Sequence, residues 1–429
     1  MASGMWCGCW ECWGWHWGSG RRDKRSRKPR PDDACDWHGS CFGFEDKRDK
    51  WELPHVALDS DKTARPDYDS MTASEYLDID EVLKAKAAVL VSLLTSAKKC
   101  ILSTGAGLST ASGIADYASA EGGIGGALSG GMGGGLGNSP FLAQPTYSHR
   151  ALVALSKAGH VHRWVQQNHD GLPQKAGLPQ EVMNEIHGSW YSPDNPVIPM
   201  SGSLREDLFV DMAACAESAD LSLAIGTSIS GLNVDRIVTI PAERAAKKEA
   251  LGTVIIGLQR TVHDRAATLR IFARCDDLFS VVAELMRLEV DPPWPKGEYF
   301  VPACLKDKSE DDFLFTGLLY DVAGVRVDTG ALTLDLRDDA ELVITGGMHK
   351  GAKGVVCGYD REGNVECRFK LKPERGKLRA QVAMKFGRWW IQAAVDGTVP
   401  RLPVVNEPAE FTAENGGLWL QSAIEEYAK

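Results

Sequence analysis

The chain has 429 residues, a formal net charge of −10 and 44% hydrophobic residues. This length allows two or three domains with their own cores, and the acidic balance argues against a protein whose whole surface tracks nucleic acid. No apolar run approaches the roughly 18 to 20 residues needed to span a bilayer. Trp and Cys interrupt the start of the chain, where a secretory signal would need a smooth apolar segment, so we expect no secretion.

Residues 1–70 are predicted to form a disordered tail. The segment from Arg21 to Arg30 carries seven basic residues against one acidic residue, and such a run stays solvated. It is either a nuclear localisation signal or nucleic-acid arm, which would favour the nucleus over the cytoplasm, or simply a solvated tail.

Five of the eleven cysteines lie in the first 41 residues. Cys9-x-x-Cys12 and Cys35-x-x-His38 have the pair spacing of a small zinc site. The low-complexity Trp and Cys around them argue against that interpretation.

Residues 71–290 alternate between helical and strand patterns. A helix is expected over 74–99, where apolar residues recur at helical spacing. Short apolar strands are expected over 100–103, 161–166, 221–225 and 253–258. Strands alternating with helices predict an α/β fold, with a Rossmann-type parallel sheet and helices on both faces. Residues 122–138 hold ten glycines in seventeen positions and are expected to be a mobile loop.

Residues 297–429 are predicted to form a small accessory β-rich domain, similar to SH3-like or KOW barrels. Short β-like runs cover 331–336, 342–345, 354–357 and 365–371, with a turn at 360–364. Between Val343 and Trp390 there are eleven basic residues against four acidic ones. The domain therefore either binds nucleic acid or protein, or carries a solvated cationic face over an aromatic core. The residues concerned are Lys350, Lys353, Arg368, Lys370, Lys372, Trp389 and Trp390.

The first candidate site follows the predicted strand at 100–103. Gly105, Ala106 and Gly107 would present backbone N–H groups at a helix start, which suits a pyrophosphate. The same pattern also simply closes tight connections between a strand and a helix.

Three further motifs carry polar groups. Gln167, Asn168 and Asp170 offer donors and acceptors suited to a sugar or a carboxamide, although the same sequence is typical of a turn. His187 has a side chain suited to base chemistry, although a lone histidine is more often structural. Gly226, Thr227 and Ser228 end another strand, at the edge where open α/β sheets bind ligands.

Taken in order, these motifs resemble the sirtuin family of NAD-dependent protein deacylases over residues 74–290. The segment from Leu258 to Asp277 looks most like the nuclear class IV branch. The matching motifs are Gly105-Ala106-Gly107-Leu108-Ser109, Ser112–Asp116, Pro145-Thr146 with His149 and Leu152, Gln167–Leu172, Ile186-His187-Gly188 and Gly226-Thr227-Ser228.

The resemblance implies NAD as cofactor and an acylated protein lysine as substrate. His187 would be the general base on the nicotinamide ribose, which Asn168 and Gln167 would hold. Ser109, Asp116 and Asp170 would line the nicotinamide pocket. The other cofactor-binding residues implied are Gly105, Ala106, Gly107, Gly226, Thr227 and Ser228 for the phosphates and adenosine, and Cys275 near adenine.

This sequence departs from the family pattern at several positions. Ala118 replaces an arginine, His169 an apolar residue and Gly257 an asparagine. The family's four-cysteine zinc ribbon is missing, because only Ser189–Asn195 separates His187-Gly188 from Pro196 and holds no cysteine. We therefore expect no metal.

The leading hypothesis is NAD-dependent removal of acyl groups from protein lysines, with release of nicotinamide and O-acyl-ADP-ribose. NAD glycohydrolysis or mono-ADP-ribosyl transfer stays open as an alternative, because His187, Asn168 and Asp170 are present while the peptide groove is altered. A non-catalytic sensor of NAD or ADP-ribose is the third hypothesis, on the grounds of Ala118, His169 and Gly257.

Overall fold

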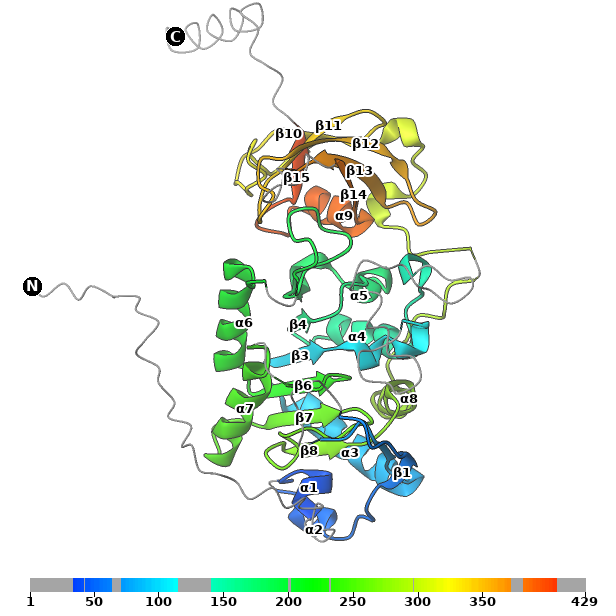
Figure 1. The fold of residues 1–429 in the computed structure, drawn as a ribbon, viewed down its shortest axis with the longest axis vertical. Helices are drawn as coiled ribbons and strands as arrows, with labels where there is room; N and C mark the ends of the chain where they lie inside the picture. Colours follow the sequence, from blue (N-terminus) through cyan, green and yellow to red (C-terminus); the bar gives the residue numbers. More distant parts are fainter. Residues whose placement is uncertain are drawn as a thin grey trace, which may run out of the picture. The chain divides into compact units, whose positions relative to one another are not determined.

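The computed structural model describes residues 34–41, 43–63, 71–114, 140–199, 202–230, 233–295, 297–371 and 381–406. Residues from Ala34 onward form one compact unit, which contains two large sheets (Figure 1). The basic run from Arg21, the Cys9-x-x-Cys12 pair and the glycine-rich insert at 122–138 lie outside the described residues.

The first of the two large sheets is parallel and has six strands in the order β5-β4-β3-β6-β7-β8. The chain passes from β3 to β4 and β5 on one side, then returns to β6 on the other side of β3. The direction of strand addition therefore reverses between β3 and β6. The bounds are β3 (Cys100–Thr104), β4 (Arg163–Gln166), β5 (Met183–Glu185), β6 (Leu221–Ile225), β7 (Gly252–Ile256) and β8 (Leu269–Ile271).

Helices cover both faces of this sheet (Figure 1). Cys100 and Leu102 of β3 pack on one face with α3, α4 and α8, whereas Ile101 packs on the other face with α6 and α7. Burial on both faces explains why the strands are unbroken apolar runs, and the predicted Rossmann-type sheet is confirmed. The helix bounds are α3 (Asp80–Ser96), α4 (Tyr147–Lys157), α6 (Glu206–Ser218), α7 (Arg236–Ala246) and α8 (Cys275–Met286).

The helix predicted over 74–99 is shorter than expected at its start. Residues Glu75–Leu77 form strand β2, which pairs with β1 (His55–Leu58). The Tyr76 amide also donates a hydrogen bond to the Leu258 carbonyl at 2.9 Å. This extended segment is therefore held by backbone partners that a helical pattern does not reveal.

Residues 34–41 and 43–63 contain regular elements, so the prediction of disorder over 1–70 is wrong for these described residues. The elements are α1 (Ala34–His38), α2 (Glu45–Arg48) and β1. The Cys41 amide donates to the Thr268 carbonyl at 2.8 Å, and the Trp37 ring lies 5.0 Å from that of Tyr76. Backbone and aromatic contacts to the domain thus hold a segment whose composition indicated a tail.

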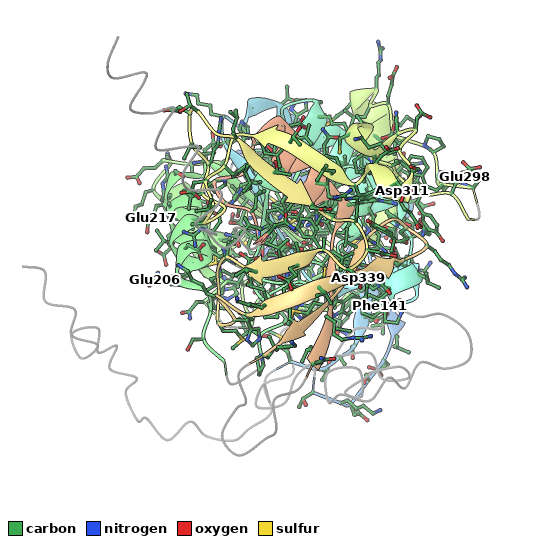
Figure 2. The ribbon with its side chains drawn as sticks, turned by 90° about the horizontal axis from the view of Figure 1, so that it is seen from above. Phe141, Glu206, Glu217, Glu298, Asp311 and Asp339 are labelled. Carbon is green, nitrogen blue, oxygen red and sulfur yellow. The ribbon has the colours of Figure 1, made fainter. Side chains whose placement is uncertain are left out.

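The C-terminal part holds a five-stranded antiparallel sheet with the order β14-β13-β12-β11-β15, a β9-β10 hairpin and helix α9 (Figure 2). Side chains of both sheets share one hydrophobic core, separate from those of the parallel sheet. The SH3 or KOW relation and the division into separate domains stay predictions. The bounds are β9 (Leu314–Leu318), β10 (Leu332–Asp335), β11 (Glu341–Ile344), β12 (Lys353–Tyr359), β13 (Val365–Lys370), β14 (Gln381–Phe386), α9 (Arg388–Asp396) and β15 (Val404–Asn406).

A buried ion pair joins the C-terminal part to the parallel-sheet part. Lys175, at the end of α5 (Leu172–Lys175), lies 2.8 Å from the Glu362 carboxylate, and the two side chains are 3% and 1% exposed. The Lys175 ammonium also donates to the backbone carbonyls of Phe141 and Ala143, at 2.7 and 3.3 Å. Burial lowers the pKa of Lys175. One ammonium therefore ties together three segments far apart in the sequence.

Aromatic packing adds to the contacts between the parallel-sheet part and the C-terminal part. The Tyr191 ring lies 5.0 Å from the Trp389 ring, and the Tyr191 carbonyl accepts a hydrogen bond from the Gly387 amide at 3.0 Å. Trp389 is buried, and Trp390 packs against the C-terminal core. The tryptophan pair is therefore part of the packing, which agrees with the alternative of an aromatic core.

Among the described residues, no helix has the length and apolar character needed to cross a bilayer.

We predict that Glu362→Ala lowers the free energy of unfolding by about 3–5 kcal/mol, because it leaves the Lys175 charge buried without its carboxylate. Urea denaturation of the full chain measures this loss. The matched control is Asp291→Ala, which breaks the exposed Lys157–Asp291 pair and should cost no more than about 1 kcal/mol. Equal losses in the two variants would contradict the structural role of Glu362.

Candidate functional site

The carboxyl ends of β3, β4 and β6 meet where the strand order reverses. In open α/β sheets, ligands bind in the crevice at this point. Ser103 of β3, Gln167 after β4 and Thr227 after β6 line a hollow of about 10 Å³, together with residues at the start of α7. Its small size means that a nucleotide would need these side chains to move.

The glycines of the first motif pack against another turn of the protein. A Cβ atom on Gly105 or on Gly107 would lie 2.8 Å from backbone atoms of Gly226, which itself has a φ of +59°. The Gly107 amide donates to the Gly226 carbonyl at 2.8 Å. These glycines therefore allow two turns to approach each other.

The turn at Gly105 does not lead into a long helix. It is followed by two 3₁₀ turns, Ala106–Leu108 and Thr110–Ser112. The helix terminus expected for a pyrophosphate is thus absent from this described segment, and the backbone N–H of Gly107 is already bonded to the protein.

Asp170 is the most constrained polar residue of the site and is 2% exposed. Its carboxylate accepts hydrogen bonds from the Ser109 hydroxyl at 2.7 Å, the Gln166 amide at 3.1 Å and the Leu172 backbone N–H at 3.0 Å. The intervening Gly171 has a φ of +62°, in the left-handed region that favours glycine. This turn brings the Leu172 N–H back to the carboxylate.

Asn168 is fixed beside Asp170 by both of its amide protons. Its Nδ2 donates to the Gly105 carbonyl at 2.9 Å and to the Ser109 hydroxyl at 3.0 Å. A carbonyl can only accept, so the amide nitrogen must face Gly105. The Asn168 Oδ1 is therefore the atom left to accept a hydrogen bond from a ligand hydroxyl.

Gln167 makes a similar bridge between neighbouring strands. Its Nε2 lies 3.0 Å from the Thr227 hydroxyl and 3.3 Å from the Ser103 hydroxyl. Gln167 and Thr227 are thus brought together, as the sequence predicted, on the β6 side of the crevice.

His187 follows β5 and lies close to the same loop. The ring Nδ1 of His169 is 2.9 Å from the carbonyl of Gly188, the residue after His187. Burial lowers the pKa of His169. The loop holding Asn168 and Asp170 is therefore joined to the His187–Gly188 turn.

The segment after Gly188 is a closed turn. The Ser189 amide donates to the Asn195 carbonyl at 2.8 Å, and a Cβ atom on Gly188 would lie 2.2 Å from the Pro196 carbonyl oxygen. Gly188 has a φ of +88°. A glycine is needed here, and the turn between residues 188 and 196 is complete with seven residues.

Two predicted cofactor residues, Ser228 and Cys275, are not among those that line the hollow, and a third is not described. Asp116 is outside the described residues. Ser228 is exposed, and its hydroxyl is bonded to that of Ser230 at 2.7 Å. Cys275 begins helix α8, where burial raises the pKa of its thiol to about 12, and it is not among the residues that line the hollow. Their roles in cofactor binding stay predictions.

The N-terminal Cys and His pair is only partly described. The Arg48 guanidinium donates to the Cys35 sulfur at 3.2 Å, and burial lowers the pKa of His38 to about 3. Cys9 and Cys12 lie outside the described residues, so the zinc alternative stays a prediction.

Two polar residues of the site were missed by the sequence analysis. Gln166 orients Asp170, as described above. Glu185 is 3% exposed, accepts a hydrogen bond from the Gln174 amide at 3.0 Å, and has its pKa raised to about 7 by burial. Glu185 follows another polar residue, Asn184, so no local pattern in the sequence marked it.

The residues present fit NAD by the chemistry of their donors and acceptors. The Asn168 Oδ1 and the Gln167 amide suit ribose hydroxyls, and Ser109 with Asp170 offers a polar pair for a carboxamide. All four follow the carboxyl ends of β3 and β4, next to the point where the strand order reverses, and Gln167 lines the hollow there.

No family model matches the chain. It is 26% identical over 264 residues to the NAD-dependent protein deacetylase SRT1 of Arabidopsis thaliana, covering 53% of this chain and 54% of the relative. It is 27% identical over 269 residues to Sirt6 of Drosophila melanogaster, and the match covers 51% of this chain and 80% of that relative. It is also 27% identical over 263 residues to human sirtuin-7, and that match covers 50% of this chain and 64% of the relative. The chain thus spans about half the length of the SRT1 relatives. A solved structure of Sir2 with a p53 peptide and NAD+ aligns with 46% of the chain at 19% identity and a TM-score of 0.40.

We predict that Glu185 makes the protein less stable as the pH rises. Its carboxyl keeps a proton up to about pH 7 in the folded state, whereas the unfolded chain releases it near pH 4.5. The associated stability is complete below pH 4.5 and is lost by the time the pH has passed 7, and the loss amounts to about 3 kcal/mol.

Denaturation of Glu185→Gln at pH 5 and pH 8 tests this linkage. The variant should lose that part of the pH dependence, because glutamine does not ionise. Glu217→Gln, at an exposed position of α6 (Figure 2), is the control and should behave as the unmodified chain does. An unchanged slope in Glu185→Gln would contradict the raised pKa.

Proposed function

We propose that the central half of the chain is a divergent sirtuin domain, which removes acyl groups from protein lysines and consumes NAD. The products are nicotinamide and O-acyl-ADP-ribose. Similarity to Sirt6 and sirtuin-7 supports an assignment to the class IV branch.

The orientation of Asn168 supports this proposal best. Its amide is locked by the Gly105 carbonyl, which directs Oδ1 to accept from a hydroxyl. A ribose offers hydroxyl donors, whereas a phosphate offers acceptors that this oxygen would repel. The site is therefore built to hold a sugar beside the Ser109–Asp170 pair.

We assign a separate role in the proposed deacylation to each of the residues of the site. NAD, when bound, supplies a glycosidic bond that breaks to release nicotinamide. Asn168 and Gln167 would orient the ribose, while Ser109 and Asp170 would bind the carboxamide. His187 would accept a proton from a ribose hydroxyl, a role suited to an imidazole.

We also propose that this domain works without a zinc ribbon. The short turn between Gly188 and Pro196 holds no cysteine. Instead, its Tyr191 packs on Trp389 and accepts a hydrogen bond from the Gly387 amide. These contacts support the turn from the C-terminal part of the chain.

The decisive experiment incubates the full chain with NAD and an acetyl-lysine peptide and measures nicotinamide and O-acyl-ADP-ribose together. We expect the two products in equal amounts, only when the peptide is present. His187→Ala should lower the rate by about 10²–10⁴-fold, because it removes the general base. His160→Ala, at the end of α4 and away from the crevice, is the matched control and should keep full activity.

Each other outcome has a definite meaning. Nicotinamide release without acyl transfer would favour NAD glycohydrolysis or ADP-ribosyl transfer, and NAD binding without turnover would favour a sensor. Full activity of His187→Ala would show that the base is another residue. Loss of activity after chelation of zinc would contradict the zinc-free domain.

A second proposal concerns the exposed face of the C-terminal sheet. Val365, Cys367 and Phe369 of β13 are buried, so Arg368 and Lys370 lie on the opposite, exposed face, and Lys350 is also exposed. We propose that this face binds nucleic acid through its phosphates. A nuclear location, indicated by the basic run from Arg21 to Arg30, would suit that role, and imaging the chain with and without this run tests it.

We predict that Lys350→Ser, Arg368→Ser and Lys370→Ser together weaken binding to duplex DNA. The slope of log affinity against log salt should fall by up to about 3, since each lost phosphate contact removes about 0.9. The control replaces Lys84, Lys98 and Lys247, which are also exposed, and should leave the slope unchanged. DNA binding that is equal in both triple variants, or absent from the full chain, would end this proposal.

A further inference from the structure

A hollow of about 450 Å³ lies in the C-terminal part, away from the crevice of the parallel sheet. Its walls come from the segment after residue 297, from the turn between β12 and β13, and from the start of α9. No residue lines both this hollow and the small one beside Thr227. The walls combine aromatic and apolar side chains with two guanidinium groups; the principal lining residues are Tyr299, Leu305, Phe313, Arg361, Glu362 and Arg388.

Arg388 is a buried cation that forms no ion pair with a carboxylate of the described residues. It is 3% exposed, and its Nε has no hydrogen-bond partner. The Tyr299 ring lies 6.0 Å from the guanidinium carbon, and burial lowers the pKa of Arg388 although the charges of Glu362 and Asp360 act against that shift. A charge buried in this way is costly unless something neutralises it.

The nearby carboxylates are already used. Glu362 pairs with Lys175 at 2.8 Å, and Asp360 pairs with Lys385 at 2.7 Å. Glu298 also borders the hollow, but it is exposed and stands at the outer edge of the molecule in Figure 2. Among the described residues, Glu362 and Asp360 therefore act on Arg388 only through their charge, and neither forms an ion pair with it.

Two further features favour a negative charge at this place. Arg361 brings a second guanidinium to the same hollow. Arg388 is the first residue of α9, a nine-residue helix whose N-cap is Gly387, and within the described residues only its first backbone N–H is bonded to a side chain, the Asn364 Oδ1 at 3.1 Å. The positive end of the helix thus adds to the two cations.

We propose that this hollow binds a small organic oxyanion, in which a phosphate or carboxylate group is attached to an aromatic or apolar body. Arg388 and Arg361 take the anionic group, since a guanidinium matches carboxylate and phosphate in shape and charge. Tyr299, Leu305 and Phe313 contact the apolar body. The site does not depend on the NAD chemistry proposed above.

Isothermal titration of the full chain with phenyl phosphate, phenylacetate and uncharged benzyl alcohol tests this proposal. We expect saturable binding of at least one anion, weaker at higher salt, and no binding of the alcohol. The anion that binds more tightly identifies the preferred head group. Arg388→Met and Arg361→Met should each weaken binding by about 10- to 100-fold, the loss typical for a hydrogen bond to a charged group.

The control is Arg337→Met, also in the C-terminal part but paired with Asp335 at 2.7 Å, and it should bind as the unmodified chain does. If Arg388→Met fails to fold, the exposed Arg361 decides the matter, because its replacement leaves the core intact. The proposal is overturned if neither anion binds, if the alcohol binds equally well, or if Arg361→Met retains full affinity.

Discussion

The carboxyl edge of the parallel sheet depends on how the Asp170 carboxylate is held. A buried carboxylate without donors would cost several kcal/mol, and here its three donors come from three segments of chain. The turn after β3, the end of β4 and the start of α5 are thereby locked to a single group. The Ser109 hydroxyl, which donates to Asp170, also accepts a hydrogen bond from the Asn168 amide, so the same hydroxyl helps to orient Asn168.

The glycine pattern at this edge is compatible with two structural roles, the close approach of a ligand and the close approach of another turn. A Gly-Ala-Gly turn after a strand suggests close approach of a ligand to the backbone. Here the close approach is between two turns, because the space beside Gly105 and Gly107 is filled by Gly226. The crevice is consequently shaped by main chain, and its polar side chains provide the chemistry.

Much of the fold could be predicted because parallel strands buried on both faces are unbroken apolar runs, and β3 and β6 lie within a residue of their predicted bounds. The strands β5 and β8 could not, since they are three residues long and hold polar residues. Arg270 of β8, for example, is fully buried and paired with Asp264 at 2.8 Å, a contact that no local pattern reveals. In the site, motif residues on neighbouring strands could be predicted, whereas Gln166 and Glu185 look like ordinary polar positions until their partners are known.

The Lys175–Glu362 pair has a consequence for how the chain can change over generations. Either residue without the other destabilises the folded protein, because its charge would remain buried without a partner. A lineage that loses one must soon replace the other, and a gene fragment that drops the C-terminal sheet must also replace Lys175. The substitutions tolerated at one position therefore depend on the residue at the other, although the two are far apart in the sequence and belong to parts with separate cores.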